Sequence, residues 1–302
     1  MSAHPTAVTA RPAAREVFGL AEGPWWDGDR QRLLWVDIVA GKVFEGSLDE
    51  DTVSVTRDWH LEGMAGAVAV TDRGSLLVAG QEGLVLLAPD GTTYAGPRLL
   101  PPASNRRLND GSTDPAGRYF VGSLTIGGPE AYAEELFVVE SDGSVAIVDD
   151  DLSLSNGLAW SADGTRMYST DTLRGLIYVR DYDPGTGARG DRRVFLEITE
   201  GYPDGCTVDS QDHLWVAHWG IGEVRRYAPD GTLVSRVSVD APNTSAVSLA
   251  GPDLCTLIIT TASVELEADA LSAHPNSGRI FTARCDVPGL PTTPAQLTWA
   301  GA

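Results

Sequence analysis

The chain has 302 residues, of which 42% are apolar, and it contains 33 glycines and 18 prolines. That length is sufficient for one large all-β domain or for two smaller domains. The formal net charge is −20, from 42 acidic and 22 basic residues, and such a surface repels phosphate backbones and anionic lipids. We therefore expect neither nucleic acid nor a membrane as a partner.

The N-terminal fifteen residues contain Pro, Ala, Thr and Arg but not the apolar stretch of a secretion signal, and no run of 18 apolar residues occurs anywhere in the chain. The three cysteines, Cys206, Cys255 and Cys285, are an odd number without a closely spaced pair. This pattern argues against a disulfide framework or a thiolate zinc site. We expect a flexible tail over residues 1–15, a single domain over residues 16–302, and a cytoplasmic protein.

A turn followed by an apolar strand recurs along the chain. The turns begin near Asp27, Thr71, Asp114, Ser161, Asp209 and Gly251. Successive turns are about 42 to 48 residues apart, which is the spacing of four-stranded propeller blades.

A second series of short apolar strands lies between these turns. Its members begin at Gly41, Gly83, Glu135, Gly175, Gly222 and Gly278. One inner and one outer hairpin per repeat make a four-stranded unit, so the sequence predicts an all-β fold, a six-bladed β-propeller with four antiparallel strands per blade. The alternative is a two-sheet sandwich of about a dozen strands, which the regular two-hairpin period disfavours.

Residues just before the first strand of each blade face one mouth of the central channel. Counting back five positions from each turn gives Glu22, Gly66, Asn109, Asn156, Asp204 and Ala246. Four of these have oxygen-bearing side chains, and hard oxygen donors of this kind suit Ca²⁺, Mg²⁺ or Mn²⁺ better than Zn²⁺. Taken singly, each Asn-Gly or Asp-Gly pair could be an ordinary turn. Four of them in phase with the repeat indicate a shared polar site.

Several phrases of the sequence resemble one known family. They are Glu22-Gly-Pro-Trp-Trp-Asp27, Leu34-Trp-Val-Asp-Ile38, Arg107-Leu-Asn-Asp-Gly111, Asp114-Pro-Ala-Gly-Arg118, Ser155-Asn-Gly-Leu-Ala159, Tyr202-Pro-Asp-Gly205 and Leu214-Trp-Val-Ala217. Together, from about residue 16 to residue 287, they are similar to the SMP-30/gluconolactonase/LRE (regucalcin-like) family. The resemblance implies a six-bladed propeller with one divalent metal at the channel mouth and hydrolysis of sugar lactones.

Carried over by motif, the resemblance implies that Glu22, Asn156 and Asp204 are metal ligands. It further implies that Arg107 and Asn109 bind substrate and that Asp204 is the catalytic general base. The expected cofactor is one divalent cation, Ca²⁺ first, with Mg²⁺, Mn²⁺ and Zn²⁺ as alternatives. A metal held by three protein oxygens keeps open positions for a carbonyl oxygen and a water molecule, which agrees with this chemistry.

The expected reaction opens an aldonolactone such as gluconolactone, xylonolactone or arabinolactone to the sugar acid. Two other functions remain open: hydrolysis of other esters or organophosphates on the same metal site, and a non-catalytic calcium- or ligand-binding propeller. The sequence departs from the family after Gly122-Ser-Leu124, where Thr125-Ile-Gly-Gly-Pro129 stands in place of an acidic residue found in some members. The identity of the lactone and the oligomeric state therefore stay open. Cys206, two residues after Asp204, is expected to be a buried filler rather than a nucleophile.

Overall fold

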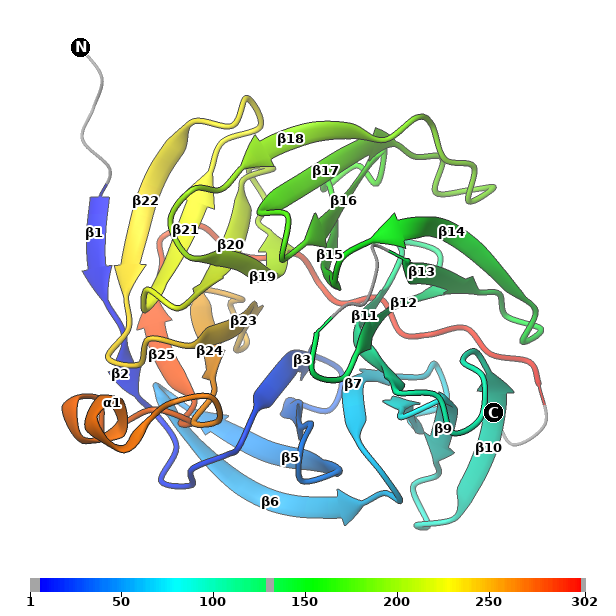
Figure 1. Ribbon diagram of the computed structural model, residues 1–302, viewed down its shortest axis with the longest axis horizontal. Coiled ribbons are helices and arrows are strands. Elements are labelled where there is room, and N and C mark those ends of the chain that lie inside the picture. Colours follow the sequence, from blue (N-terminus) through cyan, green and yellow to red (C-terminus); the bar gives the residue numbers. More distant parts are fainter. Residues whose placement is uncertain (1–5, 129–132, 300–302) are drawn as a thin grey trace.

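The computed structural model of the protein describes residues 6–128 and 133–299. In this part of the chain, six sheets stand like blades around a central axis (Figure 1). Blade 1 consists of β3 (Ala21–Asp27), β4 (Arg32–Asp37), β5 (Lys42–Asp49) and β6 (Thr52–His60). Blade 2 consists of β7 (Ala65–Val70), β8 (Leu76–Gly80), β9 (Gly83–Leu87) and β10 (Thr93–Arg98). Blade 3 consists of β11 (Arg106–Thr113), β12 (Tyr119–Thr125), β13 (Glu134–Val139) and β14 (Val145–Leu152).

The remaining three blades follow in chain order. Blade 4 consists of β15 (Ser155–Trp160), β16 (Arg166–Asp171), β17 (Leu176–Asp181) and β18 (Arg193–Glu197). Blade 5 consists of β19 (Tyr202–Val208), β20 (Leu214–Trp219), β21 (Glu223–Tyr227) and β22 (Leu233–Ser238). Blade 6 has β23 (Thr244–Ala250), β24 (Thr256–Thr261) and β25 (Phe281–Arg284), and takes its fourth strand from the N-terminus. The predicted six-bladed propeller with four antiparallel strands per blade is confirmed.

The N-terminal segment differs from the expected flexible tail. β1 (Thr6–Thr9) pairs in parallel with β22 of blade 5, and β2 (Arg11–Pro12) pairs antiparallel with β25 of blade 6. Because the sixth repeat supplies only three strands, the outer edge of β25 would otherwise be left unpaired, and pairing with β2 satisfies it. Residues 1–5 of the expected tail lie outside the described residues.

The predicted turns close the inner hairpins, and buried carboxylates hold two of them. Asp114 Oδ1 accepts hydrogen bonds from the backbone N–H groups of Ala116 at 2.9 Å and Arg118 at 2.8 Å. Asp209 Oδ1 accepts hydrogen bonds from Gln211 N–H at 2.9 Å and His213 N–H at 3.1 Å. An aspartate at the start of the turn thus provides an acceptor for the turn amides, which explains why Asp114 and Asp209 mark the repeat in the sequence.

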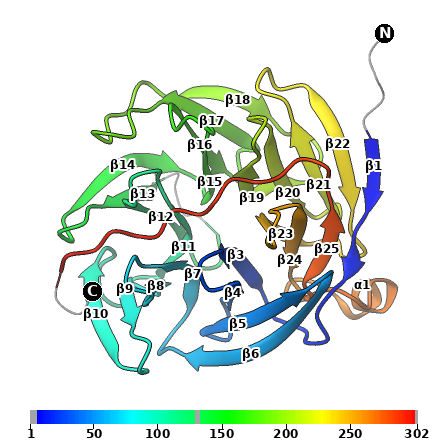
Figure 2. The ribbon, with the colours of Figure 1, turned by 180° about the vertical axis from the view of Figure 1, so that it is seen from behind.

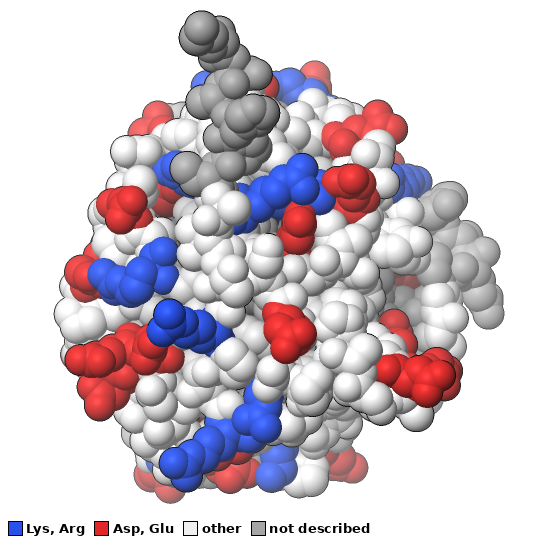
Figure 3. Space-filling view, turned by 90° about the vertical axis from the view of Figure 1, so that its left-hand side faces the viewer, with Lys and Arg blue, Asp and Glu red and all other residues white. Residues whose placement is uncertain are grey.

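Most residues of the inner strands are buried because these strands pack between neighbouring blades. β7 is the clearest case: all six of its residues are buried. Farther out, aromatic side chains fill the widening space between blades, as where Trp35 stacks on Phe44 with ring centroids 5.6 Å apart. On the outside, acidic and basic side chains are interspersed over the side of the ring seen in Figure 3. Arg284 and Asp253 form an exposed ion pair, at 2.6 Å.

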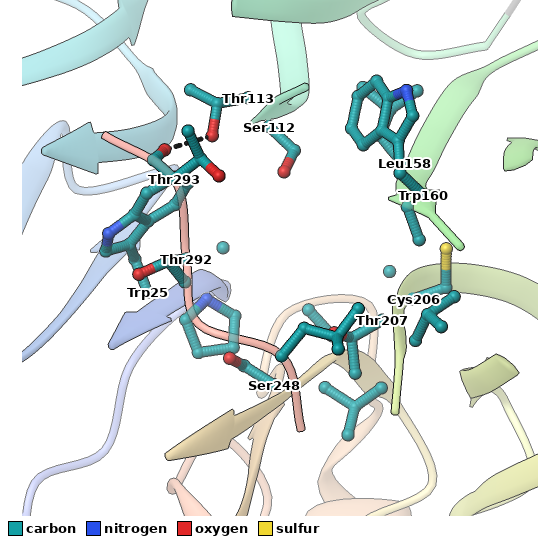
Figure 4. Close-up of a pocket in the computed structure, with 18 of the residues that line it drawn as sticks. Trp25, Ser112, Thr113, Leu158, Trp160, Cys206, Thr207, Ser248, Thr292 and Thr293 are labelled. Carbon is teal, nitrogen blue, oxygen red and sulfur yellow. Dashed lines mark hydrogen bonds between the residues drawn. The ribbon is translucent and has the colours of Figure 1, made fainter. Parts of the chain in front are cut away.

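The C-terminal segment, residues 286–299, crosses one mouth of the channel (Figure 2). Its backbone N–H groups bond to three blades: Gly289 to Leu254 O at 2.8 Å, Ala295 to Val70 O at 2.8 Å, and Gln296 to Gly117 O at 2.9 Å. This strap covers a cavity of about 290 Å³. Side chains of Trp25, Ser112, Trp160, Thr207 and Ser248 surround that cavity (Figure 4).

The single helix of the described residues, α1 (Ala268–Ala273), lies between β24 and β25 and buries none of its residues. No helix in this part of the chain has the length and apolar character needed to cross a membrane.

Candidate active site

The inner strand of every blade changes its pairing register near the channel mouth that the strap leaves uncovered. The shifts fall between Glu22 and Trp25, Ala65 and Ala67, Leu108 and Gly111, Asn156 and Leu158, Pro203 and Cys206, and Thr244 and Ala246. A β-bulge turns side chains out of the regular alternation of a strand. Repeated around the ring, it aims residues of several blades at one point.

All five site residues predicted from the sequence line one cavity of about 600 Å³ at this mouth. They are Glu22, Arg107, Asn109, Asn156 and Asp204, and each is between 5% and 8% exposed. The two small residues of the predicted ring do not line it. Ala246 lines the cavity under the strap, and Gly66 packs against the backbone of blade 3, where an added Cβ would lie 2.6 Å from Asn109 O.

A chain of hydrogen bonds fixes the orientation of the polar side chains. Arg107 Nη1 donates to Leu108 O at 3.0 Å and to Asn109 Oδ1 at 2.6 Å. Asn109 Nδ2 donates in turn to Ser155 O of the next blade at 2.9 Å. Asn156 Nδ2 donates to Thr172 Oγ1 at 3.1 Å. The bond from Nδ2 leaves Oδ1 of Asn156 as the atom available to a ligand.

Two buried oxygens of the site have no hydrogen-bond partner among the described residues: Asn156 Oδ1 and Asp204 Oδ1. Within the same part of the chain, the third oxygen donor, Glu22, accepts only the N–H of its neighbour Gly23, at 2.9 Å. Unpartnered buried oxygens are costly, and a bound cation satisfies them. In the described residues no three His, Cys, Asp or Glu side chains gather as a metal cluster, because this set combines two carboxylates with a carboxamide. Its hard oxygens still fit a divalent cation.

The pKa shifts of the site also favour a bound cation. Burial, followed by the charge of Asp110, raises the pKa of Glu22 to about 8. Burial and the charges of Glu22 and Asp110 raise the pKa of Asp204 well above its usual value. Burial lowers the pKa of Arg107 to about 10 although both carboxylates oppose this. Arg107 therefore compensates only part of the acidic charge, and the site favours further positive charge.

Asp110 is a buried acid next to the site that the sequence reasoning did not single out. It follows Asn109 within the β11 bulge, accepts Gly111 N–H at 2.8 Å and lines the cavity under the strap. Burial raises its pKa to about 6. The signal was present in the phrase Asn109-Asp-Gly111, in which a second oxygen-bearing side chain stands where blades 4 and 5 have only glycine.

The structure separates residues that the sequence placed side by side. Arg106 points away from the cavity and pairs with Glu134 at 3.1 Å and Glu135 at 2.8 Å, so the choice of Arg107 as the cavity arginine agrees with the structure. Cys206 lines the cavity under the strap, and burial raises the pKa of its thiol. A thiol that stays protonated is a filler rather than a nucleophile.

The segment in which the sequence departs from the family pattern also lines the cavity, over residues 125–128. Thr125 Oγ1 donates to Glu134 Oε1 at 2.5 Å, which ties this segment to blade 3. Pro129, the last residue of that sequence phrase, lies outside the described residues.

The fold and the site define a six-bladed propeller with an oxygen-lined pocket at one mouth of its channel. The chain belongs to the SMP-30/gluconolactonase/LRE family, because the family's SMP-30/Gluconolactonase/LRE-like region matches residues 20–263. The family predicted from the sequence phrases is confirmed.

Named relatives match most of the chain. It is 36% identical over 264 residues to "Pentonolactonase XacC" of Haloferax volcanii, covering 86% of this chain and 87% of that protein. It is 32% identical over 286 residues to the 6-deoxy-6-sulfogluconolactonase of Pseudomonas putida, covering 93% and 96%. The crystal structure of a calcium-binding protein, regucalcin, from Agrobacterium tumefaciens superposes with a TM-score of 0.90 at 29% identity, covering 98% of this chain and 100% of that one.

Proposed function

We propose that the protein is a metal-dependent lactonase that hydrolyses a small sugar lactone to its sugar acid. The lactonase class follows from the family and from relatives named pentonolactonase and 6-deoxy-6-sulfogluconolactonase. The observation that carries the rest is the convergence of five buried polar residues on one cavity, two of them with unpartnered oxygens.

The donor set supports a metal at this site. Glu22, Asn156 and Asp204 would hold it, with Ca²⁺ as the first candidate because of the calcium-binding relative and because all three donors are hard oxygens. Mg²⁺, Mn²⁺ and Zn²⁺ are the alternatives. When bound, the cation supplies Lewis acidity for the lactone carbonyl.

Asp204 is the residue suited to move the proton. Its Oδ1 lacks a partner among the described residues and can accept a proton from the attacking water. As the ring C–O bond of the lactone breaks, the same carboxyl can return that proton to the departing alkoxide oxygen. A pKa raised by burial suits this exchange, because such a carboxylate accepts a proton more readily than an exposed one.

Arg107 and Asn109 are suited to hold the substrate. Arg107 is fixed by two hydrogen bonds from one nitrogen, so its orientation does not have to be gained on binding. Asn109 is held by Ser155 O of the next blade. These groups would hydrogen-bond the hydroxyls of the sugar and keep its ester over the floor of the cavity.

The test is acid release from gluconolactone, xylonolactone and arabinolactone by chelator-treated protein, before and after a divalent cation is added back. We expect activity that depends on the cation, and a loss of kcat of about a thousandfold in Asp204→Asn. Asp58→Asn, on the exposed edge of blade 1, is the control and should keep full activity. Faster turnover of aryl esters or phosphotriesters, or cation binding with no turnover at all, would contradict the proposal.

A further inference from the structure

The walls of the active-site cavity are apolar, in contrast to its floor. All six blades contribute apolar side chains: Ile38, Met64, Leu124, Leu154, Trp219 and Val264. Ile38, Met64, Leu154 and Val264 lie in connections next to the strands, and Leu124 and Trp219 lie near the ends of β12 and β20. They therefore border the cavity around the polar ring, where the end of a substrate distal to the ester meets them. Apolar walls favour an apolar group at that end of the ligand.

Part of this apolar lining remains open to water. Val39 is 47% exposed, Leu173 is 43% exposed and Tyr202 is 49% exposed, and all three line the cavity. They come from blades 1, 4 and 5. Exposed apolar groups gathered at one opening indicate a surface that a ligand covers.

The lining provides no cation for an anionic group at the outer end. Among the described residues that line the cavity, Arg107 is the only cation, and it lies buried on the floor beside the carboxylates. The nearby Arg174 pairs with Asp171 at 3.2 Å. The other charged residue of the wall is Glu265, an exposed acid. An anionic group would meet like charge and apolar surface there, both of which oppose its binding.

We propose, on the basis of the lactonase function proposed above, that the site selects uncharged lactones whose end distal to the ester is apolar. The substrate class is a deoxy-sugar lactone that ends in a methyl group. Lactones that end in a carboxylate, sulfonate or phosphate are disfavoured. A hydroxymethyl end is intermediate, because the hydroxyls that line the cavity already have partners. Those of Thr125, Ser153 and Thr172 are hydrogen-bonded to Glu134, Asp171 and Asn156.

The test compares kcat/KM for three 1,4-lactones that differ only at carbon 6, those of 6-deoxygalactonic, galactonic and galactaric acid. We expect the methyl compound to exceed the hydroxymethyl compound by roughly tenfold and the carboxylate to be about a hundredfold slower than the methyl compound. If all three lactones are hydrolysed at equal rates, or the galactaric lactone is hydrolysed fastest, the proposed selectivity is wrong but the lactonase function stands. Failure to hydrolyse any lactone, including gluconolactone, defeats both.

Leu173→Arg places a cation on the cavity wall and tests the cause of the selectivity. The ratio of kcat/KM for the galactaric lactone to that for the 6-deoxy lactone should rise about tenfold or more. Val39→Arg makes the same test from blade 1. The matched control is Val194→Arg, since Val194 is 55% exposed on β18 and lies outside the cavity. An unchanged ratio in both wall variants, with melting temperatures like that of the parent, overturns the proposal.

Discussion

Gly157 of blade 4 lies against the backbone of Asp204 in blade 5, so that a Cβ added at Gly157 would stand 2.4 Å from the carbonyl oxygen of Asp204. The glycine that follows one proposed ligand thus sets the position of the next one around the ring. Close approach of two inner strands is possible here only without a side chain.

Gly157→Ala should therefore damage stability and activity together. The added methyl forces the two bulges apart, which is expected to cost about 1 to 3 kcal/mol of unfolding free energy and to lower kcat/KM. Thermal unfolding and lactone turnover measure the two effects. The control is Gly28→Ala, where the nearest atom to an added Cβ is 3.7 Å away. Equal effects of the two substitutions would contradict the role given to Gly157.

Thr172 is a positioning residue for Asn156. Its Oγ1 accepts the hydrogen bond from Asn156 Nδ2 and so keeps the Oδ1 atom turned toward the proposed ligand. Thr172→Val should weaken cation affinity by roughly tenfold, and Thr172→Ser should restore it. Titration of the stripped protein with Ca²⁺, followed by calorimetry, provides a measurement independent of turnover. Normal affinity in the valine variant would show that the carboxamide is oriented by other contacts.

Removal of the cation should lower stability as well as activity. The unpartnered oxygens of Asn156 and Asp204 and the buried Glu22 are costly without a positive charge, and a ligand that binds only the folded state stabilises it. We expect the melting temperature to fall in chelator and to recover with added Ca²⁺. Asp204→Asn should respond less to added Ca²⁺ than the parent. A melting temperature that chelator leaves unchanged would argue against a bound cation.

The fold could be predicted because the turns of its repeat need particular residue types. Asp114 and Asp209 accept hydrogen bonds from turn amides, and the hydroxyls of Thr71 and Ser161 do the same. Most turns therefore begin with a side-chain oxygen at a nearly fixed period. The N-terminal strands could not be foreseen. β2 has two residues, too few for any alternation, and it pairs only because β25 lacks an outer neighbour.

Part of the site could likewise be predicted from the sequence and part could not. Ring positions in phase with the repeat led to Glu22 and Asp204, whereas part of the cavity wall, including Val39 and Leu173, lies in connections between strands. Loops carry no periodic signal, so their apolar character became meaningful only once the blades brought them together. Asp110 was missed for a related reason: Asp-Gly also reads as an ordinary turn.

The buried His218 is expected to make the stability of the protein depend on pH. Its ring is fully buried, with Nδ1 3.1 Å from Glu200 O and Nε2 3.1 Å from Tyr227 Oη. Burial, as the largest cause, lowers its pKa from 6.5 to about 4. The unfolded chain therefore binds a proton at a higher pH than the folded chain does. The free energy of unfolding is therefore unaffected by His218 above pH 6.5. It falls by roughly 3 kcal/mol in total as the pH is lowered from 6.5 to 4.

The measurement for His218 is chemical unfolding of the parent and of His218→Gln between pH 4 and 8. The glutamine variant, which does not titrate, should lose less stability than the parent over the window from pH 6.5 to 4. Parallel curves would exclude His218 as a source of the acid sensitivity. His274, which is exposed beside Asp240, supplies the control substitution, His274→Gln.

The C-terminal strap should contribute to stability across blades that are far apart in the sequence. It buries Ala295 and Leu297 and bonds to Leu254 of blade 6 and Val70 of blade 2. A chain that ends at residue 285 loses these contacts and opens the covered channel mouth. It should unfold at lower denaturant concentration, with a loss of several kcal/mol from the apolar area exposed. A chain that lacks only residues 300–302 is the control, and equal midpoints for the two truncated chains would show that the strap does not hold the blades together.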